Sequence, residues 1–482
     1  MNSTSLFLLA ADAEHGPEHE VATWVTVLFA AILVAMVAAL AFEEKIHAKK
    51  SIIVGFFAGV CLITATLLHL LTFGEVHLPN GHEMDLPIYV PAIEWGVITI
   101  ILGASLFVEV TSRSGVFTWL AIKLTKKSSG NPWMLLIYYG LLTVIFSAVL
   151  NNVTAMIIIG SLTTVSLKKL EREDLLLGFL LVEGLLTNVG GLLTLISSVP
   201  NIIVGKTAGI SFVKFFIVAA PYVVLATLAT LVMGKVIFKI SGYKTEEESN
   251  KAKELVAGFD ENESIPSAKF FWMSVAALVA FIACLSAQSA LPFGLDQLGM
   301  GFIALMFAGI MLLAYKHEVD KFYSVVDWDL LAFFAGLFVV INTMEHAQVL
   351  EMIGSGIGAM LELPQSAASS LLLASSAVAS SVTDNIPLAA MLAKILETNL
   401  SVVNAQPEMS ASPFWWCVIF GANLGGNITP IGSASTVVAM TIIHKQKLNL
   451  SFMGFVKAAV PFAAVQIVLA IIYVLVAGPI LL

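Results

Sequence analysis

The chain has 482 residues, of which 58% are hydrophobic and only 12% are charged, with a formal net charge of −9 and a mean hydropathy of +0.93. Because a soluble domain carries about 25% charged residues, this composition excludes an ordinary soluble protein. It also excludes the basic surface of a nucleic-acid-binding protein, so no nucleic acid partner is expected. Several apolar runs reach roughly 20 residues, the length that crosses a bilayer as a helix. We therefore expect an all-α polytopic protein embedded in a lipid bilayer.

The spans and their orientation follow from apolar runs and basic loops. Lys45, Lys49 and Lys50 follow the first apolar run, whereas the tail 1–20 has acidic residues and no Lys or Arg. Since Lys and Arg concentrate in cytoplasmic loops, the tail is predicted outside and the first span enters the cytoplasm. The polar segment 241–268 is predicted as a cytoplasmic linker, and the C-terminus is predicted outside. The predicted simple spans are 21–42, 52–73, 88–110, 211–238, 269–292, 298–315, 327–345 and 452–481.

Two further apolar segments are predicted as re-entrant helical hairpins. The segment 132–167 has Lys126 and Lys127 before it and Lys168 and Lys169 after it, so both of its ends are predicted inside. The corresponding segment 365–400 is predicted to enter from outside. Irregular backbone at such depth is tolerated only where protein buries it or a water-filled cavity solvates it. The polar tip residues of each hairpin should therefore face the protein interior.

Two apolar stretches, 175–206 and 412–443, are interrupted by Gly, Asn, Thr, Ser and Pro. We interpret both as discontinuous helices that cross the membrane. The broken ends of such helices leave backbone N–H and C=O groups unpaired. The N–H ends attract anions and the carbonyl ends bind cations, which makes these breaks candidate ion sites.

The polar motifs occur twice along the chain. The segment from Ser147 to Val153 recurs from Ser380 to Ile386, 233 residues further, and the segment from Asn188 to Thr194 recurs from Asn423, 235 residues further. The halves 21–240 and 269–482 are each predicted to make five crossings and one hairpin. Because five is odd, the two repeats should have inverted orientations, with about ten crossings in total. This pattern is typical of secondary transporters that build one site from two repeats.

Asp384 is the leading functional candidate, because its repeat counterpart is the neutral Asn151. An acid at membrane depth is costly and marks function by default. A proton and a cation can alternate on one such carboxylate. The alternative is a purely structural role, in which Asp384 only caps the helix that follows it. Glu183, on the same helix as Asn188, is a second proton relay candidate, whose alternative role is a polar contact between helices.

The quoted motifs resemble the ion transporter superfamily, and most closely its arsenite-permease/NhaD-type, citrate-transporter-like permeases. The resemblance rests on Thr383–Pro387, Asn423–Ser433 and Asn188–Gly191 with Pro200–Gly205. It implies a homodimer in which a transport region moves in an elevator-like manner against a fixed scaffold. It also implies a polar site made of Ser147, Asn151, Asn152, Asn188, Thr194, Asp384, Asn385, Asn423, Thr429 and Ser433.

The chain departs from that family pattern at two places. Many relatives have Asp where this chain has Asn151, and many read Gly-Asp-Pro-Pro-Asn where this chain has Ser197 to Asn201. Two acids are therefore missing, and Asp384 is left as the main carboxylate. A single Asp would repel a dianion, which ranks dicarboxylate transport lower.

The leading functional hypothesis is a Na⁺/H⁺ antiporter, with Na⁺ bound by Asp384, Asn385 and Asn152 and by the hydroxyls of Thr194 and Thr429. The alternative is a permease for arsenite, antimonite or another anion, with Asp384 as proton relay. A passive channel is disfavoured because inverted broken helices indicate alternating access. An enzyme is disfavoured because the spans contain no catalytic Ser/His motif or His/Glu metal motif. No cofactor is expected beyond Na⁺ and H⁺ as coupling ions, and the expected location is a bacterial inner membrane.

Overall fold

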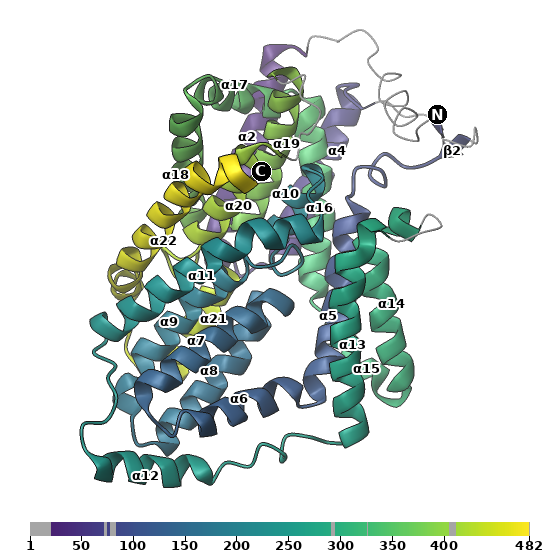
Figure 1. Ribbon diagram of the computed structural model, residues 1–482. Coiled ribbons are helices and arrows are strands. Elements are labelled where there is room, and N and C mark those ends of the chain that lie inside the picture. Colours follow the sequence, from purple (N-terminus) through teal and green to yellow (C-terminus); the bar gives the residue numbers. More distant parts are fainter. Residues whose placement is uncertain are drawn as a thin grey trace. The chain divides into compact units, whose positions relative to one another are not determined.

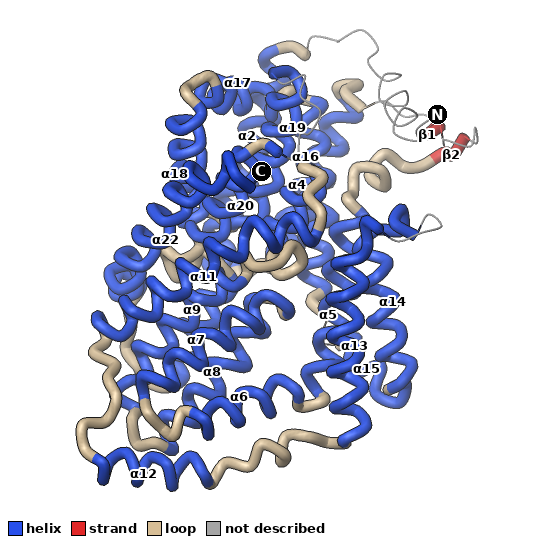
Figure 2. The backbone as a smooth tube through the Cα atoms, in the orientation of Figure 1, coloured by secondary structure: helices blue, strands red, loops and turns tan. Residues whose placement is uncertain are grey.

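The computed structural model describes residues 21–71, 75–77, 83–290, 295–324, 326–403 and 411–481. The tail 1–20 lies outside the described residues. Within these ranges the chain is helical apart from loops and one short antiparallel strand pair, β1 (Glu75–His77) with β2 (Glu83–Asp85) (Figure 2). Nine of the described helices are long and apolar enough to cross a membrane. The polytopic all-helical class predicted from composition is confirmed.

The chain forms two compact units, and the first comprises residues 1–95 and 328–355. Its main described helices are α2 (Thr23–Ala41), α4 (Lys50–Leu67) and α16 (Trp328–His346), with the short α3 (Glu43–Ile46). A Cβ added at Gly336 of α16 would lie 3.2 Å from Val54 Cγ1 and 3.4 Å from the backbone N of Gly55. Ser51 donates a hydrogen bond to the Asp329 carboxylate. The two helices therefore cross with their backbones close together.

The second unit, residues 96–327 and 356–482, contains a matching crossing. Here α5 (Trp95–Arg113) packs on α14 (Gly299–Ala314), and a Cβ added at Gly103 would lie 2.5 Å from the backbone of Ala304. Helix α13 (Ala268–Ala287) adds Phe281 to the same core, with its ring centroid 4.7 Å from that of Phe107. Only glycine at position 103 allows this approach.

Gly103 and Gly336 are repeat equivalents, and each contacts a helix from the other half of the sequence. The helix α5 of the first half packs on α14 of the second, and α16 of the second half packs on α4 of the first. The two repeats are thus interleaved. The halves 21–240 and 269–482 are repeats in sequence, but the compact units cut across them.

The polar motifs lie in two helical hairpins and two broken helices of the second unit, whose helices are labelled in Figure 1. The segment 132–167 holds a hairpin of two helices, and the segment 365–400 holds another. The segments 175–206 and 412–443 each hold two half-helices separated by irregular backbone. The bounds are α7 (Pro132–Val149), α8 (Asn152–Lys169), α9 (Leu176–Gly190), α10 (Val199–Thr207), α11 (Phe212–Ile237), α18 (Gln365–Val382), α19 (Asn385–Val403), α20 (Pro413–Gly425), α21 (Ala434–Lys445) and α22 (Phe452–Leu481).

Helices α11 and α22 occupy equivalent places in the two repeats and run antiparallel to each other. Near the start of α11, Tyr473 of α22 donates to the Val218 carbonyl at 2.5 Å. Further along, Tyr222 donates to the Gln466 carbonyl at 2.9 Å. As the residue number along α11 rises, the number of the contacting residue on α22 falls. The inverted orientation of the two repeats is therefore a feature of the fold.

The two hairpins start at opposite ends of this pair. Gly242, just beyond the end of α11, approaches Asn131 at the base of the first hairpin, where an added Cβ would lie 2.6 Å from its amide nitrogen. Gln365 at the base of the second hairpin lines one pocket together with Gly478 near the end of α22. Since α11 and α22 are antiparallel, the hairpins enter from opposite sides.

Several described helices have no counterpart among the segments predicted from sequence. Helix α6 (Val116–Lys127) precedes the first hairpin, α17 (Val349–Leu361) precedes the second, and α12 (Glu246–Ala257) lies in the linker. The N-terminus of α12 is capped by Thr245, whose hydroxyl accepts from the Glu248 N–H at 3.3 Å, and acidic residues fill its first turn. Both features stabilise a helix start. The other short elements are α15 (Val319–Tyr323) and the 3₁₀ turns η1 (Glu173–Leu175), η2 (Gln288–Ala290), η3 (Leu295–Leu298) and η4 (Lys316–Glu318).

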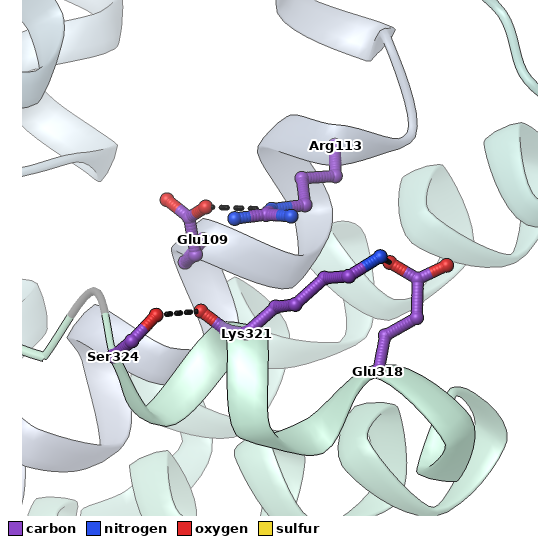
Figure 3. A network of polar contacts seen from close by, with 5 residues as sticks. All are labelled: Glu109, Arg113, Glu318, Lys321 and Ser324. Atoms are coloured by element: carbon purple, nitrogen blue, oxygen red, sulfur yellow. Dashed lines mark hydrogen bonds and ion pairs between the residues drawn. The ribbon is translucent and has the colours of Figure 1, made fainter.

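Two ion pairs lie close together at the C-terminal end of α5 (Figure 3). Arg113 pairs with Glu109 at 2.8 Å, and Lys321 pairs with Glu318 at 3.5 Å. The Arg113 guanidinium also lies 5.2 Å from the centroid of the Phe322 ring. Because these groups are partly exposed, they contribute little to stability, and they leave Glu109 a structural partner rather than a site residue.

Candidate ion-binding site

Each hairpin is fastened to the broken helix of its own repeat by a serine. Ser147 Oγ donates to the Thr187 carbonyl of α9 at 2.6 Å. Its repeat equivalent, Ser380, donates to the Ala422 carbonyl of α20 at 2.5 Å. The two contacts are the same interaction in both repeats, so the motif around each serine encodes a packing contact.

A threonine fastens each hairpin tip in the same symmetric way. Thr194 Oγ1 donates to the Ala148 carbonyl at 2.5 Å, and Thr429 Oγ1 donates to the Ser381 carbonyl at 2.6 Å. Both threonines lie in the irregular segment between two half-helices. In this structure, therefore, the two hydroxyls predicted as ion ligands hold the backbone of the hairpin tips.

One glycine in each repeat lets the hairpin pack closely against the broken helix of that repeat. A Cβ added at Gly190 would lie 2.6 Å from Val144 Cα, and a Cβ at Gly425 would lie 2.2 Å from the Ala377 carbonyl oxygen. No real Cβ is tolerated at such distances. The glycines are thus required by the close packing of backbone on backbone at these two positions.

The two broken helices are joined to each other by a reciprocal pair of hydrogen bonds. Asn188 Nδ2 donates to Ser433 Oγ at 2.9 Å, and Ser198 Oγ donates to Asn423 Oδ1 at 2.7 Å. Asn188 and Asn423 are repeat equivalents, and so are Ser198 and Ser433. All four side chains are buried. The pseudo-twofold relation predicted from sequence therefore passes through this cluster.

Asn188 is the centre of the cluster. Its Oδ1 accepts from Asn152 Nδ2 at 3.3 Å and from Ser435 Oγ at 3.1 Å, and its Nδ2 also donates to Asn427 Oδ1 at 2.8 Å. Asn427 donates in turn to Gln466 Oε1 at 2.8 Å. A continuous row of amides therefore runs from the first hairpin across both broken helices to α22.

Side chains also satisfy the irregular backbone of the breaks. Asn201 Nδ2 donates to the carbonyls of Gly191 and Thr194 at 2.7 and 3.0 Å. In the second repeat, Thr436 Oγ1 donates to the carbonyls of Pro430 and Ser433 at 3.0 and 2.7 Å. Backbone freed from helical pairing at membrane depth needs such partners.

Six residues of this network are not among the predicted site residues: Ser198, Asn201, Asn427, Ser435, Thr436 and Gln466. The first five stand inside or beside the repeated motifs, and all six are buried polar side chains. Gln466 is an amide within an otherwise apolar span. A buried polar side chain needs hydrogen-bond partners, so a polar residue within an apolar segment was the available signal for each of them.

The residues at the two hairpin tips cap helices. Asn151 Oδ1 accepts from the Thr154 N–H at 2.7 Å at the start of α8, and Asp384 Oδ1 accepts from the Ile386 N–H at 3.0 Å at the start of α19. Asn151 is exposed, whereas Asp384 and Asn385 are half-buried. The capping role weighed for Asp384 is therefore present, and it holds the carboxylate at a defined place on the tip.

The predicted site residues thus fall into two groups. Asn152, through its Nδ2 contact to Asn188 and the 2.6 Å hydrogen bond from Ser147 Oγ to its Oδ1, belongs to the amide cluster. Asp384 and Asn385 belong to the tip of the other hairpin. Within the described residues no group of three His, Cys, Asp or Glu side chains could hold a metal. The amide cluster offers neutral amide and hydroxyl oxygens, whereas the carboxylate of Asp384 lies at the tip of the other hairpin.

Paired hairpins, paired broken helices and a polar cluster at their meeting point define a membrane transporter. The chain belongs to the citrate transporter family, whose family model matches residues 19–421. It is 30% identical to an uncharacterized transporter of Mycobacterium tuberculosis over 79% of this chain and 86% of that protein. It is also 26% identical to the human P protein, over 94% of this chain and 60% of the relative.

A solved structure shares the fold. The Alcanivorax borkumensis YdaH transporter, described as having an unusual topology, superposes with a TM-score of 0.59 over 89% of this chain and 98% of its own. At 13% sequence identity this likeness concerns the fold alone. The citrate-transporter-like resemblance noted from the motifs is confirmed by the family match over residues 19–421.

Proposed function

We propose that the protein is a secondary active cation/proton antiporter whose substrate is Na⁺ and whose exchanging group is Asp384. The observation that carries this proposal is the asymmetry of the hairpin tips. Asp384 caps α19 as Asn151 caps α8, yet only one of the two equivalent positions is an acid. Capping alone is served equally well by Asn and Asp, so the charge at residue 384 has another purpose.

Competition at one carboxylate supplies the coupling. A proton and a cation each neutralise the Asp384 charge, and both cannot do so at once. In the low dielectric of a closed site an uncompensated carboxylate is costly, so the tip crosses the membrane carrying one of the two. Amide and hydroxyl oxygens from the broken helices complete the cation's ligand set once the present hydrogen bonds rearrange.

The movement proposed is elevator-like. The serine and threonine contacts join each hairpin tip to a broken helix, and the Asn–Ser pair joins the broken helices to each other. These elements form one body through buried hydrogen bonds, which favours their moving together. A homodimer that supplies a fixed scaffold is part of this proposal, and so is an inner-membrane location with both termini outside.

A second candidate is proton-coupled transport of an anion. The family's name refers to citrate, which favours a carboxylate anion as the substrate. Arsenite and antimonite are the inorganic alternatives. In either case Asp384 would carry the proton that accompanies or replaces the anion, rather than bind the anion itself.

The test is sodium-triggered dissipation of a pH gradient in proteoliposomes. Wild type should respond to added NaCl, and Asp384→Asn, which preserves the cap, should lose the response. Glu397→Gln is the matched control: it removes one carboxylate from the same helix at a partly exposed pair with Lys394, and it should transport as wild type does. A wild-type preparation that ignores sodium but takes up citrate or arsenite would overturn the antiporter proposal in favour of the anion.

A further inference from the structure

Glu183 is a buried carboxyl outside the amide cluster. It lies in α9 with 0% of its surface exposed. Thr163 Oγ1 donates to its Oε1 at 2.6 Å, whereas its Oε2 has no hydrogen-bond partner among the described atoms. An isolated ionised carboxylate in an apolar interior is far too costly to persist, so the group holds a proton in this state.

A row of hydroxyls leads away from Glu183. Thr163 and Ser166 lie one turn apart on α8 and share a face. Ser166 Oγ is 2.7 Å from the Tyr139 hydroxyl, which is 2.5 Å from Thr125 Oγ1. The row therefore connects α9 through α8 and α7 to α6.

The row ends beside the linker. Thr125 is fully buried in the last turn of α6, but the next residue, Lys126, is partly exposed and pairs with Glu261 of the linker at 2.6 Å. Ser128 Oγ, also near this end, donates to the Thr125 carbonyl at 2.6 Å. The last hydroxyl of the row is therefore buried, and the residue that follows it in sequence is partly exposed.

Among the described residues, no cation lies against Glu183 to account for it as half of an ion pair. Helices α7, α8, α11, α20, α21 and α22 pack against α9. Their bases Lys168, Lys169, His444 and Lys445 stand in the last turns of α8 and α21. Lys214 stands in the first turn of α11, and Lys235 lies over the Trp133 ring at 4.7 Å. The Tyr222 hydroxyl donates to the Gln466 carbonyl, and Cys417 of α20 is a buried free thiol. Lys457 and Tyr473 lie on α22, where Tyr473 donates to the Val218 carbonyl.

The fold does not require a carboxyl at this place. By the repeat spacing, the equivalents of Glu183, Thr163 and Tyr139 are Val418, Leu396 and Leu372. Those three residues are buried and apolar. The same architecture is thus built in the second repeat without any of these polar groups, which argues against a purely structural role.

We infer that Glu183 is a second proton-binding site, loaded and unloaded through Thr163, Ser166, Tyr139 and Thr125 from the linker end of the first hairpin. In each transfer a hydroxyl accepts a proton on one side and gives its own to the next oxygen, and water takes the last one at the surface. The inference rests on the proposed proton-coupled exchange. With Asp384 it makes two proton-carrying carboxyls for each cation, so the exchange moves net charge.

The first experiment compares electrogenicity. Wild-type exchange should respond to an imposed membrane potential, whereas Glu183→Gln, which keeps the size and the Thr163 contact, should exchange one proton per Na⁺ and lose that response. A Gln variant that remains as potential-sensitive as wild type would overturn the inference. Absence of any sodium-coupled proton movement in wild type would instead remove the proposed function.

The second experiment does not depend on transport. The difference between infrared spectra of wild type and Glu183→Gln should contain the carbonyl band of a protonated carboxyl whose intensity changes with pH. Tyr139→Phe should slow that change by about tenfold through loss of a link in the row. The control is Tyr222→Phe, which removes an equally buried hydroxyl elsewhere. A band that is absent, or that stays constant through the whole pH range in which the protein is folded, would overturn the inference even if antiport is real.

Discussion

The side-chain amide of Asn188 donates to Ser433 Oγ at 2.9 Å and so joins residues 245 positions apart. The contact from Ser198 to Asn423, equivalent by the pseudo-twofold relation of the repeats, makes this a reciprocal pair. Broken helices expose backbone that must be satisfied inside the protein. In this pair, each broken helix supplies a side chain that hydrogen-bonds to the other broken helix. The cluster therefore forms only when both repeats are folded together.

The energetic coupling of Asn188 and Ser433 is directly testable. Asn188→Ala and Ser433→Ala should each destabilise the detergent-solubilised protein by about 1–3 kcal/mol, because a buried polar partner is left unpaired. The double variant should cost less than the sum of the two, since neighbours in one network are not additive. Thermal or denaturant unfolding measures all three. Ser370→Ala, which removes an exposed hydroxyl bonded only within α18, is the control, and full additivity would contradict the contact.

The glycines under the hairpins should resist substitution. Gly190→Ala and Gly425→Ala place a methyl against backbone atoms at 2.6 and 2.2 Å, so each should cost about 1–3 kcal/mol and reduce transport. Gly309→Ala in α14 meets nothing within 4 Å and should be neutral or slightly stabilising. The measurements are the folding yield and the thermal unfolding midpoint of the three variants. Equal behaviour of all three variants would count against the close approach.

Replacing Asn151 with Asp should change coupling without changing stability. Asp caps a helix as well as Asn does, so the Thr154 contact is kept and stability should stay within about 0.5 kcal/mol. A second tip carboxylate should raise the number of protons exchanged per cation, which the potential dependence of exchange reports. Asn131→Asp makes the same change at the cap of α7, at the base of that hairpin, and should leave the stoichiometry unaltered. An effect of equal size there would argue against a tip-specific role.

The linker should loosen in acid. Lys126 donates to Glu261 and holds the pKa of that carboxyl below its usual range. A lowered folded-state pKa adds stability that is present above the ordinary Glu value and is lost as pH falls through the lowered one. Protease cleavage of the linker should therefore increase as the pH drops from neutral to below about 4. The linker of Glu261→Gln should be cleaved at neutral pH as fast as the wild-type linker is cleaved in acid. The linker of Glu254→Gln should be cleaved at the wild-type rate. A pH-independent rate in wild type would contradict the pairing.

Much of the architecture was predictable because it depends on local pattern. Apolar run lengths indicate spans, and the basic residues around 132–167 indicate a hairpin. The recurrence of Ser147 at Ser380 and of Asn188 at Asn423 indicates inverted repeats. Composition and spacing carry these signals because a bilayer penalises unpaired backbone and charge at any place along the chain.

Other features could not be predicted, because they depend on which helices cross. Thr194 and Thr429 resemble ligands in sequence, yet in this structure they hold hairpin carbonyls. Gln466 looks like a lone polar residue, yet it receives the Asn427 amide at 2.8 Å. The hydroxyl row from Thr163 to Thr125 spans three helices that no motif connects. A side chain's partner is set by helix registry and crossing, which sequence spacing does not encode.

The sequence by itself determined a membrane protein of two inverted repeats, with one acid, Asp384, at a hairpin tip whose equivalent is neutral. Only the tertiary structure decided that α5 and α16 each pack on a helix of the other repeat and that Asn188 bonds to the surrounding amides. It also decided that Glu183 lies buried with one oxygen that has no partner among the described residues. The physical reason is that lipid selects segments one at a time by their hydrophobicity. Hydrogen bonds and close backbone contacts form only after segments from both repeats have packed together.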